Sequence, residues 1–212
     1  MRPQAPSQAG RDLPQADKAL VVDLRAPAEY ARGHPKGAVS LPFSAKGLSQ
    51  RLAVVVEPGT PVGLLASEPA VASAALAQLR NGYPAISVID GGDQRDPGLN
   101  VESLRDIAID TLAEVAGSGD LTVLDVREPI EWETGYAPAA VLIPLGNLRE
   151  RLETVRRDRL VAVICEAGVR SSTAASLLQA AGFPTVATVS EGMSAYRRAG
   201  LPLEFPESQA QG

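Results

Sequence analysis

The sequence holds very little cysteine, histidine or tryptophan, with one residue of each among 212. One cysteine cannot close an internal disulfide, and one histidine with one cysteine cannot supply the four protein ligands of an ordinary zinc site. A membrane-spanning helix needs about 18 consecutive apolar residues, and no stretch of the sequence approaches this length. Residues 1–7 lack the apolar core of a signal peptide. We therefore expect no metal, no disulfide, no membrane association and, by default, a cytoplasmic location.

An excess of positive charge is also missing. The 20 lysines and arginines are outnumbered by 25 acidic residues, for a net charge of -5. Non-specific nucleic-acid binders neutralise phosphates with clustered basic residues, so no nucleic-acid partner is expected. The arginines between positions 149 and 159 alternate with acidic residues, which favours a solvated helix face over an anion-binding patch. With 45% hydrophobic and 21% charged residues, the chain is typical of a globular protein.

Two stretches of the chain, residues 20–30 and 122–132, repeat one motif. Each contains Asp-x-Arg, as Asp23–Arg25 and Asp125–Arg127, followed by Pro, Glu and an aromatic residue at matching offsets. The agreement continues in the same order through three further pairs, which are Gly33-His34 with Gly135-Tyr136, residues 38–42 with 140–144, and residues 82–84 with 182–184. The chain therefore consists of two copies of one unit.

Each unit alternates short β-branched runs with longer helix-like segments. In the second unit we expect strands at 121–126, 141–143, 161–165 and 185–189, with a helix over 172–181 that ends at Gly182. This alternation predicts an α/β fold of two domains, each a small and mostly parallel sheet with helices on both faces. The predicted domains span 16–99 and 104–205, with a turn-rich boundary loop at 91–98 and flexible termini at 1–15 and 206–212.

The segment around Cys165 is the most informative part of the sequence. A buried-type strand ends there, and a loop containing Gly168, Arg170, Ser171 and Ser172 leads into the helix. Ligands of open α/β sheets bind at the carboxyl ends of the strands. Free loop amides and the helix dipole favour a thiolate, Arg170 adds a permanent cation, and the two serines are able to cap the helix or to donate hydrogen bonds to sulfur. The loop suits a stabilised sulfur anion.

These motifs resemble the rhodanese family, whose domains carry Asp-x-Arg, Glu-aromatic, Gly-His and a Cys-x-x-Gly-x-Arg-Ser loop. The resemblance covers residues 18–92 and 108–203. It implies a sulfurtransferase in which Cys165 takes a sulfane sulfur from a donor such as thiosulfate, becomes a persulfide, and passes the sulfur to cyanide or a thiol. It implies no cofactor, and its partners are this small donor and acceptor or an acceptor protein.

The resemblance also assigns roles to other residues of the second unit. Loop residues would bind the sulfur and its donor, mainly through backbone amides; they are Glu166, Ala167, Gly168, Val169, Arg170 and Ser171. Asp125 and Arg127 would fix the loops near the site rather than act in catalysis. Glu166 would repel an anionic donor if it pointed inward, so we expect it to point to solvent, where its charge is screened.

The first unit departs from the family pattern at the loop. Ala66 or Ser67 falls opposite Cys165, depending on where a one-residue gap is placed, and no arginine follows. We therefore expect an inactive first domain that supports the second, with Ser67 as a turn or helix-cap residue. Tyr136 stands where the family has histidine, and His34, which the first unit keeps, is expected to be structural.

Two other functions remain as alternatives. Cysteine-dependent phosphatases and arsenate reductases also place a thiolate before a helix, but their loops put one more residue between Cys and Arg than the four found here. A non-enzymatic binding or sulfur-relay module is the second alternative, because rhodanese-like domains take such roles when their loop decays. The loop of the second unit is intact.

Overall fold

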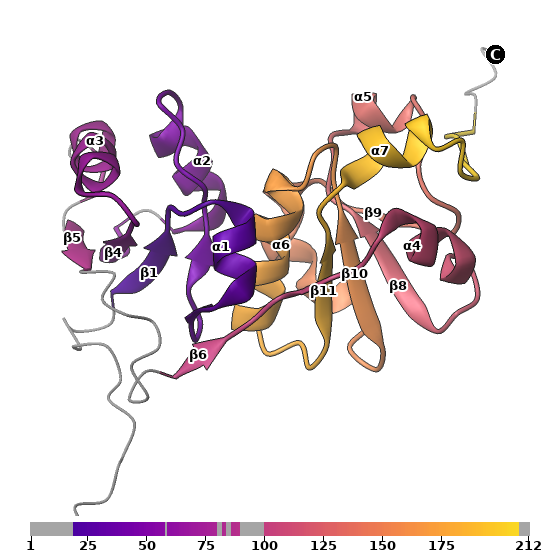
Figure 1. Ribbon diagram of the computed structural model, residues 1–212, viewed down its shortest axis with the longest axis horizontal. Coiled ribbons are helices and arrows are strands. Elements are labelled where there is room, and N and C mark those ends of the chain that lie inside the picture. Colours follow the sequence, from indigo (N-terminus) through magenta and orange to yellow (C-terminus); the bar gives the residue numbers. More distant parts are fainter. Residues whose placement is uncertain (1–18, 58, 80–81, 84–85, 90–99, 208–212) are drawn as a thin grey trace, which may run out of the picture.

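The computed structural model describes residues 19–57, 59–79, 82–83, 86–89 and 100–207. The boundary loop 91–98, residues 1–15 and most of the C-terminal segment that we expected to be flexible lie outside this part of the chain. Figure 1 shows the two sheets side by side, with helix α6 and, next to it, helix α1 between them. The predicted α/β class is confirmed, with two units that each have a parallel sheet.

The first domain is built on a four-stranded parallel sheet in the order β3-β1-β4-β5. Its strands are β1 (Leu20–Asp23), β3 (Val39–Ser40), β4 (Val62–Leu65) and β5 (Ile86–Ile89), and its helices are α1 (Pro27–Arg32), α2 (Leu48–Val55) and α3 (Pro69–Leu79). A short strand, β2 (His34–Pro35), pairs antiparallel with β6 (Val101–Glu102), which precedes the second sheet in the chain.

The second domain has a five-stranded parallel sheet in the order β7-β11-β10-β8-β9. The strands are β7 (Arg105–Asp106), β8 (Leu121–Asp125), β9 (Val141–Leu142), β10 (Leu160–Ile164) and β11 (Val186–Val189). The helices are α4 (Ile109–Val115), α5 (Pro129–Trp132), α6 (Val169–Ala180) and α7 (Gly192–Arg198), with the 3-10 turns η1 (Leu145–Asn147) and η2 (Arg149–Thr154). The four strands expected in this unit are all present, each within one residue of its expected ends.

Both faces of the second sheet are buried. Leu112 of α4 and Met193 and Tyr196 of α7 pack on one face in a separate apolar cluster. The other face belongs to a core that runs without interruption from the first domain into the second and includes Leu64 and Leu178. Because one apolar core packs against both sheets, each domain stabilises the other.

Helix α6 joins the domains through polar contacts as well as apolar ones. The Ser172 hydroxyl lies 2.8 Å from the Ser40 hydroxyl, and the Ser176 hydroxyl accepts a hydrogen bond of 3.0 Å from the Ser40 amide. Ser40 ends β3, an edge strand whose outer backbone groups would otherwise be buried without partners. The Ser176 hydroxyl thus satisfies the Ser40 amide at that edge.

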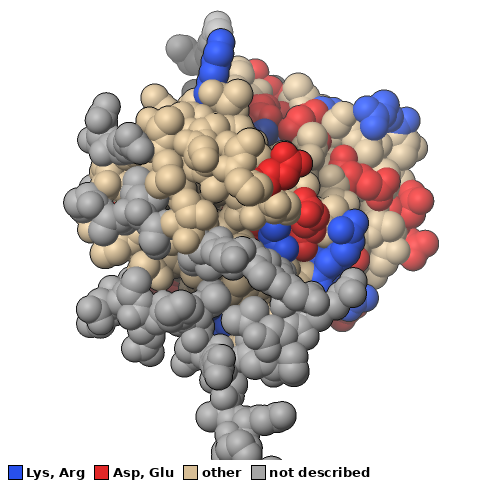
Figure 2. Space-filling model, turned by 60° about the vertical axis from the view of Figure 1, so that its left-hand side comes forward, with Lys and Arg blue, Asp and Glu red and all other residues tan. Residues whose placement is uncertain are grey.

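The arginines between positions 149 and 159 do not form the single solvated helix face that we expected, because some of them make specific contacts. Arg149 donates to the Val55 carbonyl oxygen at 2.8 Å and pairs with Glu57 at 3.2 Å, so it joins the two domains. Arg157 lies over the Phe183 ring, 4.1 Å from its centroid. Figure 2 shows acidic and basic side chains interspersed, and few charges on the part of the first domain that faces the viewer.

Candidate active site

The cysteine loop lies at the carboxyl edge of the second sheet. Strand β10 ends at Ile164 and α6 begins at Val169, so residues 165–168 form the turn between them. The helix starts three residues earlier than expected, because Gly168 already makes the turn that begins it. Cys165 is 1% exposed. The structure therefore places the thiol in the predicted position and almost entirely out of solvent.

Two glycines make this tight turn possible. Gly168 has φ +84°, and a Cβ there would lie 2.4 Å from the Ser190 carbonyl oxygen. Gly192 has φ +70°, and a Cβ there would lie 2.3 Å from the Glu166 carbonyl oxygen. Both positions combine a left-handed backbone with a close backbone approach, so each requires glycine. Sequence reasoning gave Gly192 no role at the site.

Helix α7 holds the loop from the other side. The Met193 amide donates to the Cys165 carbonyl oxygen at 2.8 Å, and the Ser194 amide donates to the Glu166 carbonyl oxygen at 3.1 Å. The carbonyl oxygens of Cys165 and Glu166 are therefore bound. Within the described chain, no group accepts a hydrogen bond from the backbone amides of residues 166–170, so these amides are free to bind a ligand. Together with the α6 dipole, such amides stabilise an anion.

The side chain of Arg170 is bound to a glutamate. Its Nη1 and Nη2 donate to the two carboxylate oxygens of Glu131 at 2.5 and 2.7 Å. The hydrogen bonds from Arg170 lower the pKa of Glu131 to about 2, so the pair stays charged at neutral pH. Arg170 therefore closes the loop against α5, and its charge is largely compensated. Glu131 belongs to the Glu-aromatic motif, but sequence reasoning gave it no role at the site.

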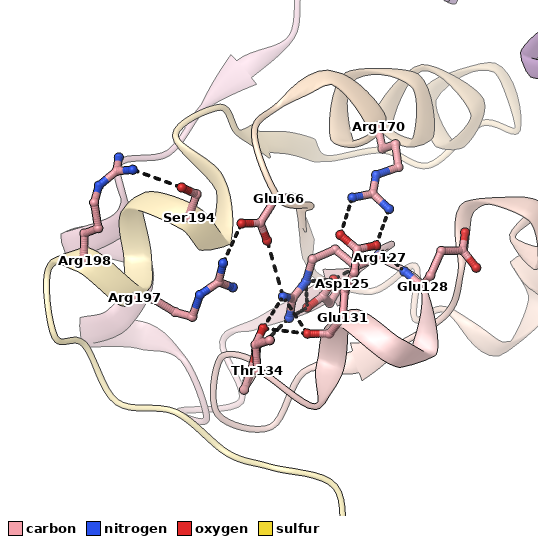
Figure 3. A network of polar contacts seen from close by, with 11 residues as sticks. Asp125, Arg127, Glu128, Glu131, Thr134, Glu166, Arg170, Ser194, Arg197 and Arg198 are labelled. Carbon is pink, nitrogen blue, oxygen red and sulfur yellow. Dashed lines mark hydrogen bonds and ion pairs between the residues drawn. The ribbon is translucent and has the colours of Figure 1, made fainter. Parts of the chain in front are cut away.

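The expectation that Glu166 points to solvent is wrong. Its carboxylate lies 2.5 Å from Nη2 of Arg197 and 3.6 Å from Nη1 of Arg127, as Figure 3 shows. The side chain is 35% exposed. The two arginines hold the negative charge in place and compensate it, which removes much of its repulsion toward an anionic donor. No feature of the sequence pointed to Arg197.

Asp125 and Arg127 form a fully buried ion pair beneath the loop. Nε and Nη2 of Arg127 donate to the Asp125 carboxylate at 2.8–3.1 Å, and Nη2 also donates to the Gly135 carbonyl oxygen at 2.8 Å. The first domain repeats this arrangement, with Arg25 bound to Asp23 and to the Gly33 carbonyl oxygen. The pair thus ties the end of a strand to the loop that follows the next helix.

The remaining predicted residues take varied positions. Ser171 is buried, and its hydroxyl donates to the Gly168 carbonyl oxygen at 3.0 Å, so it supports the loop. Ala167 and Val169 are exposed at the loop surface. His34 is buried and stacked on Tyr30 at 3.7 Å, and its Nδ1 lies 2.8 Å from the Tyr30 carbonyl oxygen. Burial lowers the pKa of His34, which is therefore neutral at pH 7.

The first domain has a shorter turn where the second has its cysteine loop. Three residues, 66–68, separate β4 from α3, whereas four, 165–168, separate β10 from α6. Ser67 lies in this bend, and its hydroxyl donates to Glu29 at 3.0 Å. Glu29 is the counterpart of Glu131. A serine hydrogen bond thus stands where the second domain has the Arg170 ion pair.

Two cavities flank the beginning of α6, both between the domains. One, of about 280 Å³, includes Leu41, Arg51 and Arg170 in its lining. The other, of about 400 Å³, includes Ala28, Gly168 and Ser190. Each therefore combines residues of the first domain with residues of the cysteine loop or of helix α6. Among the described residues, no group of three or more His, Cys, Asp or Glu is placed to hold a metal ion.

The chain belongs to the rhodanese family. The model of the rhodanese-like domain matches residues 7–94 and again residues 108–199, so the chain carries two such domains in tandem. The boundaries 16–99 and 104–205 remain our prediction. In the part of the chain that the structure describes, no helix is both long and apolar enough to cross a bilayer.

Several relatives match about half of the chain. A sulfurtransferase of Allochromatium vinosum is 32% identical over 93 residues, which are 44% of this chain and 87% of that protein. The putative sulfur carrier protein YrkF of Bacillus subtilis is 34% identical over 95 residues, which are 44% of this chain; the match spans 51% of that relative. A rhodanese-related protein structure from Thermoplasma volcanium is 35% identical, with a TM-score of 0.44, and covers 47% of this chain and 97% of that one.

Proposed function

We propose that the protein is a sulfurtransferase that carries a sulfane sulfur on Cys165. The observation that supports this most is the loop itself: a buried thiol between the end of β10 and the start of α6, in a turn whose amides at 166–170 have no acceptor within the described chain. Sulfur transfer in general agrees with the relatives named as sulfurtransferases. Persulfide formation and thiosulfate as donor are our proposal.

The proposed reaction has two displacements. The Cys165 thiolate attacks the sulfane sulfur of thiosulfate, the S–S bond of thiosulfate breaks, and sulfite leaves with the bonding electrons. Cyanide or a thiolate then attacks the outer sulfur of the resulting persulfide, and Cys165 leaves as a thiolate. Both transition states carry charge on sulfur, which the loop amides and the helix dipole stabilise without any rearrangement.

Replacing Cys165 by alanine should reduce thiocyanate formation from thiosulfate and cyanide to the rate without protein. Steady-state measurements at neutral pH test this. The matched control is Ser67→Ala, which changes the corresponding turn of the first domain and should leave the rate unchanged. Turnover retained in Cys165→Ala would show that sulfur transfer does not pass through this thiol.

The arginine that holds Glu166 should affect the binding of an anionic donor. In Arg197→Met, the Glu166 carboxylate loses its 2.5 Å partner, and its repulsion should raise KM for thiosulfate by about fivefold, as expected for a partly exposed ion pair. Adding Glu166→Gln to this variant should restore KM. Arg198→Met is the control, because Arg198 bonds to Ser194 and not to Glu166. A KM that the second substitution fails to restore would contradict this explanation.

A further inference from the structure

The segment that connects the two domains is hydrogen-bonded to both of them. Near its start, the Lys36 amide donates to the Asn100 carbonyl oxygen and the Leu104 amide to the Ala31 carbonyl oxygen, each at 2.9 Å, and β6 pairs with β2. Near its end, β7 pairs in parallel with β11 of the second sheet. In Figure 1 the segment runs from β6 past α6 to α4. Residues 100–108, here called the connecting segment, are therefore held by both domains.

Asp106 ends β7 and binds the turn between β11 and α7. Its Oδ1 accepts a hydrogen bond from the Ser190 amide at 2.9 Å, and its Oδ2 accepts one from the Ser190 hydroxyl at 2.7 Å. The Thr188 hydroxyl lies 3.3 Å from the same Oδ1. Hydrogen bonds to an ionised carboxylate are stronger than those between neutral groups. One side chain of the connecting segment therefore fixes both the backbone and the side chain of Ser190.

A second carboxylate binds in the opposite direction. Glu191, the next residue of the same turn, accepts a hydrogen bond of 3.2 Å from the amide of Ile109, the first residue of α4. Between these two carboxylates, the Ile107 amide donates to the Thr188 carbonyl oxygen at 2.8 Å. The connecting segment and the β11–α7 turn thus exchange hydrogen bonds in both directions, so they move together.

The turn that Asp106 holds is also the turn that supports the cysteine loop. The Ser190 carbonyl oxygen lies so close to Gly168 that a Cβ there would be 2.4 Å from it. Gly192, two residues further on, approaches the Glu166 carbonyl oxygen in the same way. Backbones packed this closely leave no free space to absorb a shift. A displacement of Ser190 would therefore displace the cysteine loop as well.

We propose, on the basis of the sulfur-transfer function above, that Asp106 is a positioning residue for the cysteine loop. It acts through Ser190: the carboxylate holds the turn, and the turn holds Gly168 and the loop amides in the geometry that stabilises charge on sulfur. Such stabilisation depends on preorganised donors, and a misplacement of about 1 Å can reduce a rate by about 100-fold. Because the connecting segment is also bound to the first domain, that domain contributes to the geometry of the site.

The charge of Asp106 and its hydrogen bonds have opposite effects on the reaction. Asp106 lines the larger interdomain cavity together with Ala167 and Gly168 of the cysteine loop. Its negative charge alone would oppose an anionic donor and a thiolate, so removing only the charge should not slow persulfide formation. Removing the hydrogen bonds should slow it. Asparagine separates the two effects, because its amide can bond to both the amide and the hydroxyl of Ser190 but carries no charge.

The test compares Asp106→Ala with Asp106→Asn in the full chain, by single-turnover persulfide formation from thiosulfate followed by intact mass. In Asp106→Ala the rate constant at saturating thiosulfate should fall about tenfold, as for the loss of a hydrogen bond to a charged group, while the half-saturating concentration stays within about twofold. Asp106→Asn should retain at least about half of the rate constant, because it keeps these hydrogen bonds. Asp110→Ala, which removes an exposed aspartate from the first turn of α4, is the matched control and should leave the rate constant unchanged.

A double substitution tests whether Asp106 acts through Ser190. Ser190→Ala removes only the hydroxyl bond and leaves the backbone bond to Asp106, so it should slow persulfide formation less than Asp106→Ala does. In the Asp106→Ala background it should have almost no further effect, since both substitutions act on one contact. Ser190 is exposed, so this variant also tests the proposal if Asp106→Ala does not fold.

The outcomes separate this inference from the proposed function. If thiosulfate loads the unmodified protein but Asp106→Ala and Asp106→Asn change the rate constant equally, Asp106 acts through its charge and the positioning role is wrong. Multiplicative losses in the Asp106→Ala, Ser190→Ala double variant, or an unchanged rate constant in both single alanine variants, would also overturn it. In each of these cases sulfur transfer stands. If the unmodified protein is never loaded, the sulfur-transfer function itself is wrong.

Discussion

Replacing Arg127 by methionine should lower the free energy of unfolding by about 3–5 kcal/mol, the usual cost of removing one partner of a buried ion pair. Asp125 is fully buried and would lose its counterion. The Gly135 carbonyl oxygen would also lose its donor. Urea unfolding followed by circular dichroism measures the change.

The control for this variant is Arg156→Met. Arg156 also pairs with an aspartate, Asp158, at 2.7 Å, but both side chains are more than half exposed. An exposed pair contributes little to stability, because water screens both charges. Equal losses in the two variants would contradict the view that burial makes the Asp125–Arg127 pair important.

Removing the first domain should lower the stability of the second domain even more than Arg127→Met does. In a chain of residues 105–212, the side of α6 that carries Ser172 and Ser176 would face water, and the shared core would lose its first-domain half. We expect the melting temperature to fall by more than about 10 °C, since several kcal/mol are lost from a domain of this size.

Thermal unfolding, solubility and thiocyanate formation of the 105–212 chain test this prediction. The full chain with Ser176→Ala is a useful comparison, because it leaves the Ser40 amide without its acceptor and should cost about 1–3 kcal/mol. A 105–212 chain that is soluble, unfolds at the temperature of the full chain and is fully active would show that the first domain gives no support.

The α/β fold of two domains could be predicted from the sequence because the motifs and apolar runs that indicate it are local and occur in both domains. The Asp-x-Arg motif occurs twice, and in both domains the arginine binds the aspartate and a glycine carbonyl eight residues further on. The four strands expected in the second domain agree with the structure to within one residue, because each is a short apolar run. The start of α6 was placed too late, since the sequence does not reveal the left-handed conformation of Gly168.

The long-range parts of the site could not be predicted in this way. Arg197 reaches Glu166 from helix α7, and Ser40 meets Ser172 across 132 positions of the chain. Neither contact leaves a periodic or compositional trace in the sequence. Arg51 is likewise one arginine among many until the fold places it on a cavity beside the cysteine loop.

The proposal that Cys165 carries the sulfur is tested most simply by the intact mass of the protein after incubation with thiosulfate. We predict that the mass increases by one sulfur atom, that cyanide removes this sulfur, and that Cys165→Ala gains none. A protein that gains no sulfur from thiosulfate or from a thiol persulfide, or that gains it equally well without Cys165, would contradict the proposal that this thiol carries the sulfur.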